Sequence, residues 1–560
     1  MSHITHFYHL AALDYLDVLT ATAGTGGPSV VMPPWTPYHR NTDSIGDIQG
    51  NPTVNTIRDV LVGHYVEALS IRRKAHIAAA EVDGKHPCQN AQVPGGMTTK
   101  PSRVNWANVL SLLTDIRKFI NTKYIPDLLS VALIYGSPAL LPVATIGVWP
   151  KAAGQGPNLF LQGYGCGNLL AYGAFTQPQA TGNQKLFSQG RITVPAVTGV
   201  TGTYPNITLT GGLTTVVAPS TVDVTQIIEH VNNSKYSSPT KLHPSVGQTT
   251  PDFSAGYTWH KAPRYGPGGT SDLVYEVGPL ARMVVNAMAN NPTAVSDKDL
   301  VGFGIPQDTV GFTLGTVTGL GSGSTPAIGP LDYTCQSLVT AVLLQLQTAL
   351  GCIAGGVNYA LLMSVLGRHA ARALECKYLA DALACGASVP LPTKLTPGPT
   401  YPNCTAGIPI INNVILDPNP NSDVYTYQVM PKAFKMGYGL TEAPRGALGH
   451  WITTEFRRIV NYQCVVPSTW NASGKDDNNN MGPIEQSLLG LNIGDPLAAD
   501  PAGTTSEMIS INRLLRAIHP FDICVACSVH VADTKGNNLL KFTMDPDGKV
   551  TQVEKATKED

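Results

Sequence analysis

Apolar residues recur at helical spacing in the first part of the chain. In residues 51–82, which contain VNTIRDVLVGHYVEALSIRRKAHIAAAEV, the charged side chains group on the face opposite the apolar one. This is the pattern of a long amphipathic helix. Residues 1–20 follow the same pattern, and residues 106–135 predict a further helix with a break near Pro126, because proline ends or kinks a helix.

The pattern changes between residues 176 and 222. This stretch contains ITVPAVTGVTGTYPNITLTGGLTTVVAP and carries almost no charge, which predicts short strands joined by turns. Residues 301–330 have the same character, and helices resume between residues 331 and 383. A mixed region of strands and loops follows and ends in a short helix at residues 506–518. Because no internal repeat or clear linker is visible, we expect an α+β fold, predominantly helical, with elements that interlock around one helical core.

One uncharged run is long enough to cross a bilayer. Residues 337–366, SLVTAVLLQLQTALGCIAGGVNYALLMSVL, contain no charged residue, and about 20 apolar residues span a membrane as a helix. The polar residues Gln345, Gln347 and Asn358 inside the run favour a buried helix of a large bundle instead.

Charged residues are scarce in this chain. They make up 13% of the 560 residues, against about 25% in an average protein. Large size or a large obligate interface with a partner explains this equally well. A net charge of -1 without a cluster of Lys and Arg excludes electrostatic binding of nucleic acid. Ten dispersed cysteines with one C-x-x-C pair do not form a disulfide framework.

The sharpest chemical signal is the C-x-x-C pair in the stretch PFDICVACSVHV near the C-terminus. Its spacing lets the sulfurs of Cys524 and Cys527 contact one metal ion or two adjacent ions. Thiolates are soft ligands that suit nickel, iron–sulfur clusters, zinc or copper(I). A zinc half-site or a redox dithiol has the same spacing. Asp522 adds a proton acceptor, and His530 adds a ligand for a harder metal.

Two further stretches place polar side chains in defined positions. In TEAPRGALGHW, Pro444 fixes the backbone before Arg445 and Gly446 permits close approach after it, so the guanidinium is held in one place. A structural ion pair is the alternative role for Arg445. In NYQCVVPSTWN, Ser468 is able to donate a hydrogen bond into an apolar site.

Together these motifs resemble the large subunit of nickel-iron hydrogenases of the uptake type. The order TEAPRGALGHW, NYQCVVPSTWN, GPIEQSLLG and HPFDICVACSVH is similar to the C-terminal half of that family. Upstream, HFYHLAALDYLDV, RRKAHIAAAEVDGKHP, VPGG, KAPRY and EVGPLARM extend the resemblance over nearly the whole chain, apart from the Gly/Thr-rich insertions. The resemblance implies a hydrogenase large-subunit fold with long core helices and β-rich peripheral insertions.

The resemblance also implies the roles of single residues. Cys524 would be a terminal thiolate on nickel, and Cys527 would bridge nickel and an iron that carries carbon monoxide and cyanide. Arg445 would lie over the open coordination position with Asp522 beside it, as the catalytic residues. Arg445 and Ser468 would donate hydrogen bonds to the cyanides, which are anionic acceptors in a site of low dielectric.

A magnesium ion and a processing point follow from the same resemblance. His530 would bind magnesium together with the backbone carbonyl of Cys464. Residues 1–530 would form the hydrogenase domain, and residues 531–560 would be an extension that a maturation protease removes by cutting between His530 and Val531.

Family members carry a further Cys-Gly-x-Cys segment that supplies the other two thiolates, and this sequence contains no second C-x-x-C pair. We therefore weigh three accounts: a split large subunit whose separate N-terminal fragment carries the first pair and which is inactive alone, a misplaced gene start, or a degenerate relative. The degenerate form would be a non-catalytic structural subunit of the same fold, as in respiratory complex I.

The expected function is heterolytic oxidation or evolution of H2, with electrons passed to an iron–sulfur small subunit. The sequence MSHITHFYHLAALDYLDV lacks the basic and apolar regions of a secretory signal. Export to the periplasmic side of the membrane would therefore depend on the signal of the small subunit, and a cytoplasmic location is the alternative.

Overall fold

The fold was analysed in a computed structural model of the chain. The structure describes most of residues 57–128, 163–297, 332–384, 432–491 and 514–555, with short gaps inside these ranges. Several predictions lie outside the described residues. They are the helix at residues 1–20, the strands at residues 301–330, most of the helix at residues 506–518, and both cysteines of the C-x-x-C pair.

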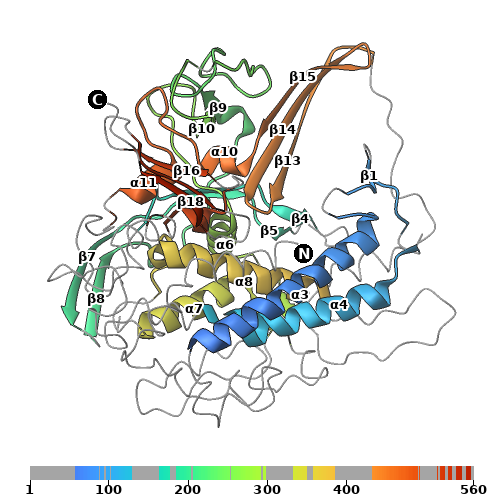
Figure 1. Cartoon of the computed structure of the whole chain (residues 1–560), viewed down its shortest axis with the longest axis vertical. Coiled ribbons are helices and arrows are strands. Elements are labelled where there is room, and N and C mark those ends of the chain that lie inside the picture. Colours follow the sequence, from blue (N-terminus) through green and yellow to red (C-terminus); the bar gives the residue numbers. More distant parts are fainter. Residues whose placement is uncertain are drawn as a thin grey trace, which may run out of the picture. The chain divides into compact units, whose positions relative to one another are not determined.

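The chain divides into two compact units, Met1–Phe521 and Asp522–Asp560. Helices form the core of the first unit (Figure 1). They are α3 (Ile57–Asp83), α4 (Trp106–Phe119), α6 (Pro279–Met288), α7 (Cys335–Ala349) and α8 (Val365–Ala384). Helix α3 packs on α4, while α6 contacts both α7 and α8. The helical periodicity of residues 51–82 is thus confirmed by α3. Helix α4 confirms the start of the helix predicted at residues 106–135 and continues as a π-helical turn, Ile120–Tyr124; residues 129–135 lie outside the described residues.

Helix α8 is buried on all sides along almost its whole length. A helix of this kind is usually apolar all round, yet α8 has the sequence VLGRHAARALECKYLADALA and carries several charges into the core. Buried charges must be paired. The contacts that pair them hold the candidate site in place, as described below.

The uncharged run at residues 337–366 is divided between three elements. Helix α7, the 3-10 turn Tyr359–Leu362 and the start of α8 share it. Its polar residues are used internally, since the Gln347 side-chain oxygen accepts the Asn358 N–H at 2.7 Å. The described parts of the run are therefore helical and mostly buried, as predicted, and they belong to separate helical elements. Among the helices that the structure describes, none is long and apolar enough to cross a membrane.

The described part of the first unit also contains antiparallel strand pairs. The pairs are β1 (Gln92–Val93) with β2 (Gly96–Met97), β3 (Asn168–Ala171) with β6 (Gly190–Thr193), β4 (Ala174–Thr176) with β5 (Lys185–Phe187), β7 (Val197–Thr203) with β8 (Asn206–Gly211), β9 (Ile227–His230) with β10 (Ala262–Tyr265), and β11 (Ala294–Ser296) with β12 (Asp332–Thr334). Strands β5 to β8 confirm the strands and turns predicted between residues 176 and 222. The fold is α+β; the predominance of helix stays a prediction.

A three-stranded sheet carries two of the sequence motifs. It consists of β13 (Lys435–Ala443), β14 (Gly446–Glu455) and β15 (Arg458–Val465), drawn in orange in Figure 1. Two short helices follow, α10 (Pro467–Asn471) and α11 (Pro483–Leu488). The inner end of the sheet and α10 share a second apolar cluster, which includes Trp451, Val465 and Trp470.

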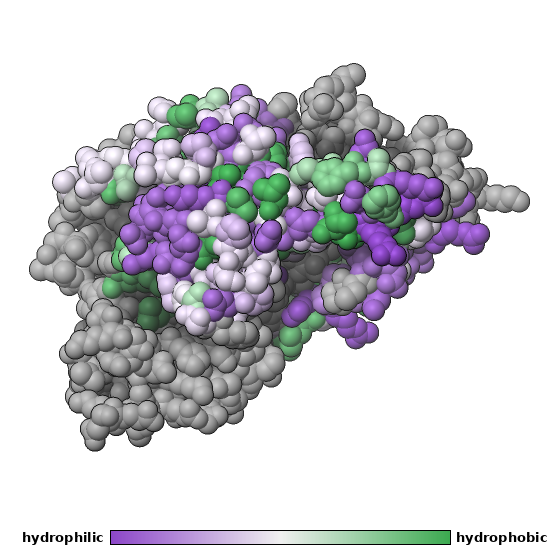
Figure 2. Space-filling model, turned by 90° about the horizontal axis from the view of Figure 1, so that it is seen from above, coloured by the Kyte–Doolittle hydropathy of each residue, from purple (hydrophilic) through white to green (hydrophobic). Residues whose placement is uncertain are grey.

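The outer part of this sheet leaves large apolar side chains exposed. They are Met436, Tyr438, Ile459, Val460 and Tyr462. On the face of the molecule shown in Figure 2, apolar residues likewise gather in small patches between hydrophilic ones. Contiguous exposed apolar residues are typical of surfaces that bind another protein.

The second unit contains one antiparallel sheet of β16 (Ser528–Ala532), β17 (Asn538–Met544) and β18 (Val550–Lys555). His530 pairs with Lys541 and Val531 pairs with Leu540. The bond between His530 and Val531, at which we expect the protease to cut, therefore lies inside β16. The boundary between the two compact units lies earlier, between Phe521 and Asp522.

Candidate functional site

Arg445 lies in a two-residue turn between β13 and β14. The flanking residues Ala443 and Gly446 pair with each other across the turn. Gly446 has φ +136°, and a Cβ atom there would lie 2.6 Å from the backbone nitrogen of Gly278. Gly278 has φ +125°, and its own Cβ would lie 2.9 Å from the carbonyl oxygen of Arg445. Glycine at both positions thus allows the start of α6 to touch the turn.

A single arginine of α6 contacts the same turn. The guanidinium of Arg282 donates from Nη1 to the Ala443 carbonyl at 2.9 Å and from Nη2 to the Pro444 carbonyl at 2.8 Å. It also donates to the carboxylates of Glu375 in α8 and Glu442 in β13. The Glu442 side chain in turn accepts the Tyr172 N–H at 2.6 Å. The turn is therefore tied directly to α6, and to α8 through the Arg282–Glu375 pair, while Glu442 joins the end of β13 to the residue that follows β3.

This cluster holds two carboxylates against one guanidinium, all nearly inaccessible to solvent. Burial lowers the pKa of Arg282, but the charges of Glu375 and Glu442 outweigh it and raise that pKa above its usual value. Burial raises the pKa of Glu442, which the Arg282 guanidinium only partly offsets. The guanidinium thus stays charged, and it stabilises the carboxylates in a site of low dielectric.

Helix α8 also holds the residues that lead into the C-x-x-C segment. Its Arg372 donates from Nη2 to the Pro520 carbonyl at 2.7 Å. One turn earlier, the Arg368 guanidinium lies 4.1 Å from the ring centroid of Phe521 and makes a bidentate ion pair with Glu276. The 3-10 turn His519–Phe521 is therefore fixed against α8 at the end of the first unit.

Ser468 lies in the first turn of α10 and is buried. The last residue of that helix, Asn471, accepts the Val277 N–H at 3.0 Å and donates to the Val277 carbonyl at 2.8 Å. Val277 directly precedes Gly278, which touches the turn of Arg445. The motifs around Arg445 and Ser468, which are separate in sequence, are therefore anchored to the same backbone segment, as the hypothesis of one site requires.

Asp522 follows the last residue of the first unit. It is buried and has φ +52°, a left-handed conformation that is uncommon for any residue except glycine. Such conformations persist only where the surroundings impose them, and they cluster at functional sites. Cys524 and Cys527 follow in the segment that the structure does not describe.

The two predicted magnesium ligands are described only in part. Of His530, the structure gives the backbone, in β16. Cys464 is in β15 with an exposed side chain, and its sulfur lies 3.3 Å from Nδ1 of His450 on the adjacent strand. Among the residues that the structure describes, no group of three or more His, Cys, Asp or Glu side chains is arranged to hold a metal ion. The metal ligands therefore remain predictions.

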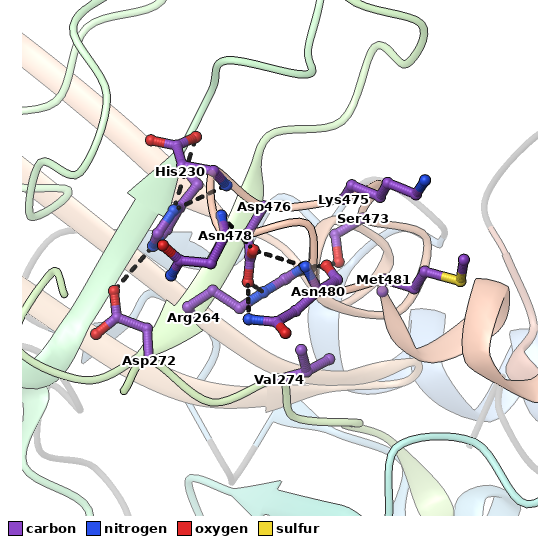
Figure 3. Close-up of polar contacts among 12 residues, drawn as sticks. His230, Arg264, Asp272, Val274, Ser473, Lys475, Asp476, Asn478, Asn480 and Met481 are labelled. Carbon is purple, nitrogen blue, oxygen red and sulfur yellow. Dashed lines mark hydrogen bonds and ion pairs between the residues drawn. The ribbon is translucent and has the colours of Figure 1, made fainter. Parts of the chain in front are cut away.

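A second polar cluster was not predicted from the sequence. Figure 3 shows the loop at residues 473–481, in which the Asp476 carboxylate accepts the backbone N–H groups of Asn478 and Asn480 and the Nε–H of Arg264 at 2.8 Å. Burial raises the pKa of Asp476, but the Asn480 N–H and Arg264 outweigh it and hold that pKa below its usual range. The dense run KDDNNN is the sequence signal for such a turn.

In the same cluster, a buried histidine joins the loop to β9. Nε2 of His230 lies 2.9 Å from a carboxylate oxygen of Asp272, and its Nδ1 accepts the Asp477 N–H at 3.3 Å (Figure 3). Since Nδ1 accepts, Nε2 carries the proton and donates it to Asp272. The cluster ties the loop before α11 to the β9–β10 pair, which is a structural role.

The charged residues of α8 were also missed. Arg368, Arg372 and Glu375 recur at intervals of four and three residues, which puts them on one helix face. Charges on one face usually mark the solvent side of a helix. Helical spacing alone therefore could not have identified them as buried contacts of the motif-bearing segments.

Comparison with known proteins identifies the same resemblance. A family model described as "Nickel-dependent hydrogenase" matches residues 45–388 and 412–530. The large chain of the quinone-reactive Ni/Fe-hydrogenase of Wolinella succinogenes is 26% identical over 600 residues, covering 97% of this chain and 81% of the relative. The large subunit of the periplasmic NiFeSe hydrogenase of Desulfomicrobium baculatum is 26% identical, covering 95% and 76%.

Solved structures agree in fold. A variant of the NiFeSe hydrogenase from Desulfovibrio vulgaris Hildenborough superposes with a TM-score of 0.55 at 24% identity, covering 93% of this chain and 77% of that chain. The superposition confirms the large-subunit fold expected from the motifs.

Proposed function

The chain belongs to the nickel-dependent hydrogenase family, and from this membership we propose the composition of its metal centre and of its assembly. The chain is a hydrogenase large subunit, part of an oxidoreductase that acts on H2. The observation that carries this conclusion is the family match. It covers residues 45–388 and 412–530 and so includes the turn of Arg445, the helix of Ser468 and the C-x-x-C segment.

The donor set suits the metal. Deprotonated thiolates are soft ligands that bind nickel well, and Cys524 and Cys527 supply two of them. In this proposal Cys524 would be a thiolate ligand of nickel, and Cys527 would be a thiolate ligand shared by nickel and an iron that carries carbon monoxide and cyanide. When bound, the centre supplies a Lewis-acidic position at which H2 is polarised and cleaved heterolytically.

The residues of this chain provide the polar groups around the centre. The Arg445 guanidinium and the Ser468 hydroxyl donate hydrogen bonds to the cyanides, and the preorganised turn and helix hold these donors in place. The Asp522 carboxylate accepts the proton that leaves H2, as a general base. The fixed turn of Arg445 and the left-handed backbone of Asp522 support these roles.

A magnesium ion and a processing step complete the proposed maturation. His530 and the Cys464 carbonyl bind magnesium, and a maturation protease removes residues 531–560. The match to the family model ends at residue 530, which supports a junction between His530 and Val531.

The partners follow from the centre and from the relatives. The chain works with a small subunit, which we propose carries the iron–sulfur clusters; the exposed apolar residues of β13 and β15 support a large interface. Cys524 and Cys527 supply two of four thiolates, so we propose that a segment with Arg-x-Cys-Gly-x-Cys, either on a separate polypeptide or ahead of Met1, supplies the other pair.

We propose a location on the periplasmic side of the membrane, reached by export with the small subunit. One relative is named as periplasmic and another as quinone-reactive, which supports this location over the cytoplasm.

Co-expression tests the proposal. The chain is produced with its small subunit and any polypeptide encoded upstream that carries the first cysteine pair, and nickel, iron and the mass of the chain are measured. We expect about one nickel per chain and loss of residues 531–560. Cys524→Ala should bind no nickel and keep the extension, whereas Cys335→Ala, which changes a buried cysteine of α7, should bind nickel normally.

A wild-type complex without nickel, with residues 531–560 still attached, would contradict the proposal. It would favour the non-catalytic structural subunit instead.

A further inference from the structure

We infer that Arg282 is a positioning residue for Arg445, and that Glu375 of α8 holds it in that role. The inference rests on the proposed function, in which Arg445 donates to the cyanides. Neither Arg282 nor Glu375 is one of the predicted metal or cyanide contacts. Their effect on the centre would be indirect, through the backbone of the turn.

The hydrogen bonds of Arg282 use all five N–H donors of its guanidinium. Nε and Nη2 bind the two carboxylate oxygens of Glu375 at 2.8 and 2.7 Å, and Nη1 binds Glu442 at 2.7 Å. The remaining donors bind the Ala443 and Pro444 carbonyls. A planar guanidinium offers five donors in a fixed fork, whereas a lysine offers three on a flexible stem. Lysine at this position cannot make the same set of contacts.

The geometry makes the turn sensitive to this one side chain. The two carbonyls that Arg282 binds belong to the two residues directly before Arg445. On the other side, Gly446 is already in close contact with Gly278. The turn is therefore held between α6 and one guanidinium, so a shift of Arg282 moves the backbone that carries Arg445.

Glu375 connects this arrangement to the C-x-x-C segment. It lies on α8 with Arg372, which binds the Pro520 carbonyl, and with Arg368, which stacks on Phe521. One buried helix thus fixes both the turn of Arg445 and the chain that leads to Cys524. We therefore infer that α8 is the common support of the two segments, with Glu375 as its contact to the Arg445 side.

The test uses two variants and a matched control in the complex with the small subunit. Arg282→Lys removes the planar set of five donors, and Glu375→Gln replaces the ion pair with Arg282 by a weaker neutral hydrogen bond. The control is Asp297→Asn, because the Asp297 carboxylate also forms a buried ion pair with α8, at 2.8 Å from Nζ of Lys377. The five hydrogen bonds of Arg282 go instead to Glu375, Glu442 and the turn.

The readouts are the nickel content, the infrared stretching bands of CO and cyanide, the melting temperature, and kcat and KM for H2. In both test variants we expect nickel to be retained, the cyanide bands to shift while the CO band changes little, and kcat to fall by about 10- to 100-fold with little change in KM. The Asp297→Asn control should lower the melting temperature and leave the cyanide bands unchanged.

Three outcomes separate the inference from the proposed function. A wild-type complex without nickel and without CO and cyanide bands contradicts the proposed function itself. Wild-type cyanide bands in Arg282→Lys, with a melting temperature lowered as in the control, would show a purely structural role and overturn the inference. If Arg282→Lys does not incorporate nickel, the cyanide bands and the melting temperature of Glu375→Gln are compared with the control instead. This variant keeps Arg282 and its contacts to the turn.

Discussion

The side-chain amide of Asn471 pairs with both backbone polar groups of Val277. It accepts the N–H at 3.0 Å and donates to the carbonyl at 2.8 Å, and both residues are buried. The side-chain amide therefore makes the pair of hydrogen bonds that a neighbouring β-strand would make with Val277. It joins α10, which carries Ser468, to the start of α6 beside Arg445.

Replacing Asn471 with aspartate should make stability depend on pH. The carboxylate can still accept the Val277 N–H, but at neutral pH it faces the carbonyl without a proton to donate, at a cost of about 1–3 kcal/mol or more. Burial should raise the pKa of the new carboxyl. Its penalty is then largest above that pKa and decreases as pH falls through it, because the protonated form can donate.

Urea unfolding of Asn471→Asp and wild type between pH 4 and 8 measures this difference. Asn471→Ala is the control, since it loses both hydrogen bonds at every pH. A constant difference for Asn471→Asp over the whole range would show that the carbonyl contact does not matter.

Alanine at Gly446 should distort the turn of Arg445. Its Cβ would lie 2.6 Å from the Gly278 nitrogen and 2.7 Å from a methyl group of Val277, at φ +136°. We expect a loss of about 2–4 kcal/mol in unfolding free energy. Gly439→Ala in the same hairpin meets nothing within 4 Å and should change stability little, so equal effects of the two variants would refute the close packing.

Asp476 should contribute stability that is lost in acid. Its pKa is lowered in the folded state, so its contribution is present above about pH 4, the ordinary range of a carboxyl group, and is lost as pH falls through the lowered pKa. Asp476→Asn leaves the buried Arg264 without its ion pair and should cost about 3–5 kcal/mol at pH 7.

The measurement is thermal or urea unfolding of wild type and Asp476→Asn from pH 7 to pH 3. The difference between their unfolding free energies should decrease as the pH falls. Asp223→Asn is the control, because Asp223 also has a lowered pKa but is exposed. A difference in unfolding free energy that increases in acid would contradict a lowered pKa of Asp476.

Arg445→Lys should impair turnover without unfolding the protein. Lysine keeps the charge but loses the planar fork of donors, and loss of an oriented donor at a reacting centre typically lowers kcat about 100-fold or more. The assay is H2 oxidation by the complex, with Arg457→Lys at the outer end of the β14–β15 hairpin as the control. Unchanged kcat in Arg445→Lys would remove Arg445 from the site.

The sequence predicted those elements whose signal is local. Helix α3 followed from its apolar spacing, and β5 to β8 followed from residues rich in Thr, Val, Gly and Pro. In each case the residues that determine the structure are neighbours in the chain. The motif order also identified the family, because four ordered motifs are far more specific than one.

The contacts that α6 and α8 make around the candidate site could not be predicted in the same way. Whether Glu375 faces water or Arg282 depends on which helix covers α8, and helical spacing gives the same pattern for both cases. The close contact of Gly278 with Gly446 likewise exists only once α6 and the hairpin have met. The left-handed backbone of Asp522 depends on its surroundings, and no residue type near it predicts that conformation.

The contacts of Arg282 have a consequence for the order of folding. They join residues that are 93 and 160 positions apart in sequence, and the ion pair of Arg117 with Asp381 spans 264 positions. Contacts between such distant residues close large loops and form slowly. The turn of Arg445 therefore acquires its final geometry only after synthesis has passed β14 and α6 has docked on α8, and we expect nickel insertion to follow that docking.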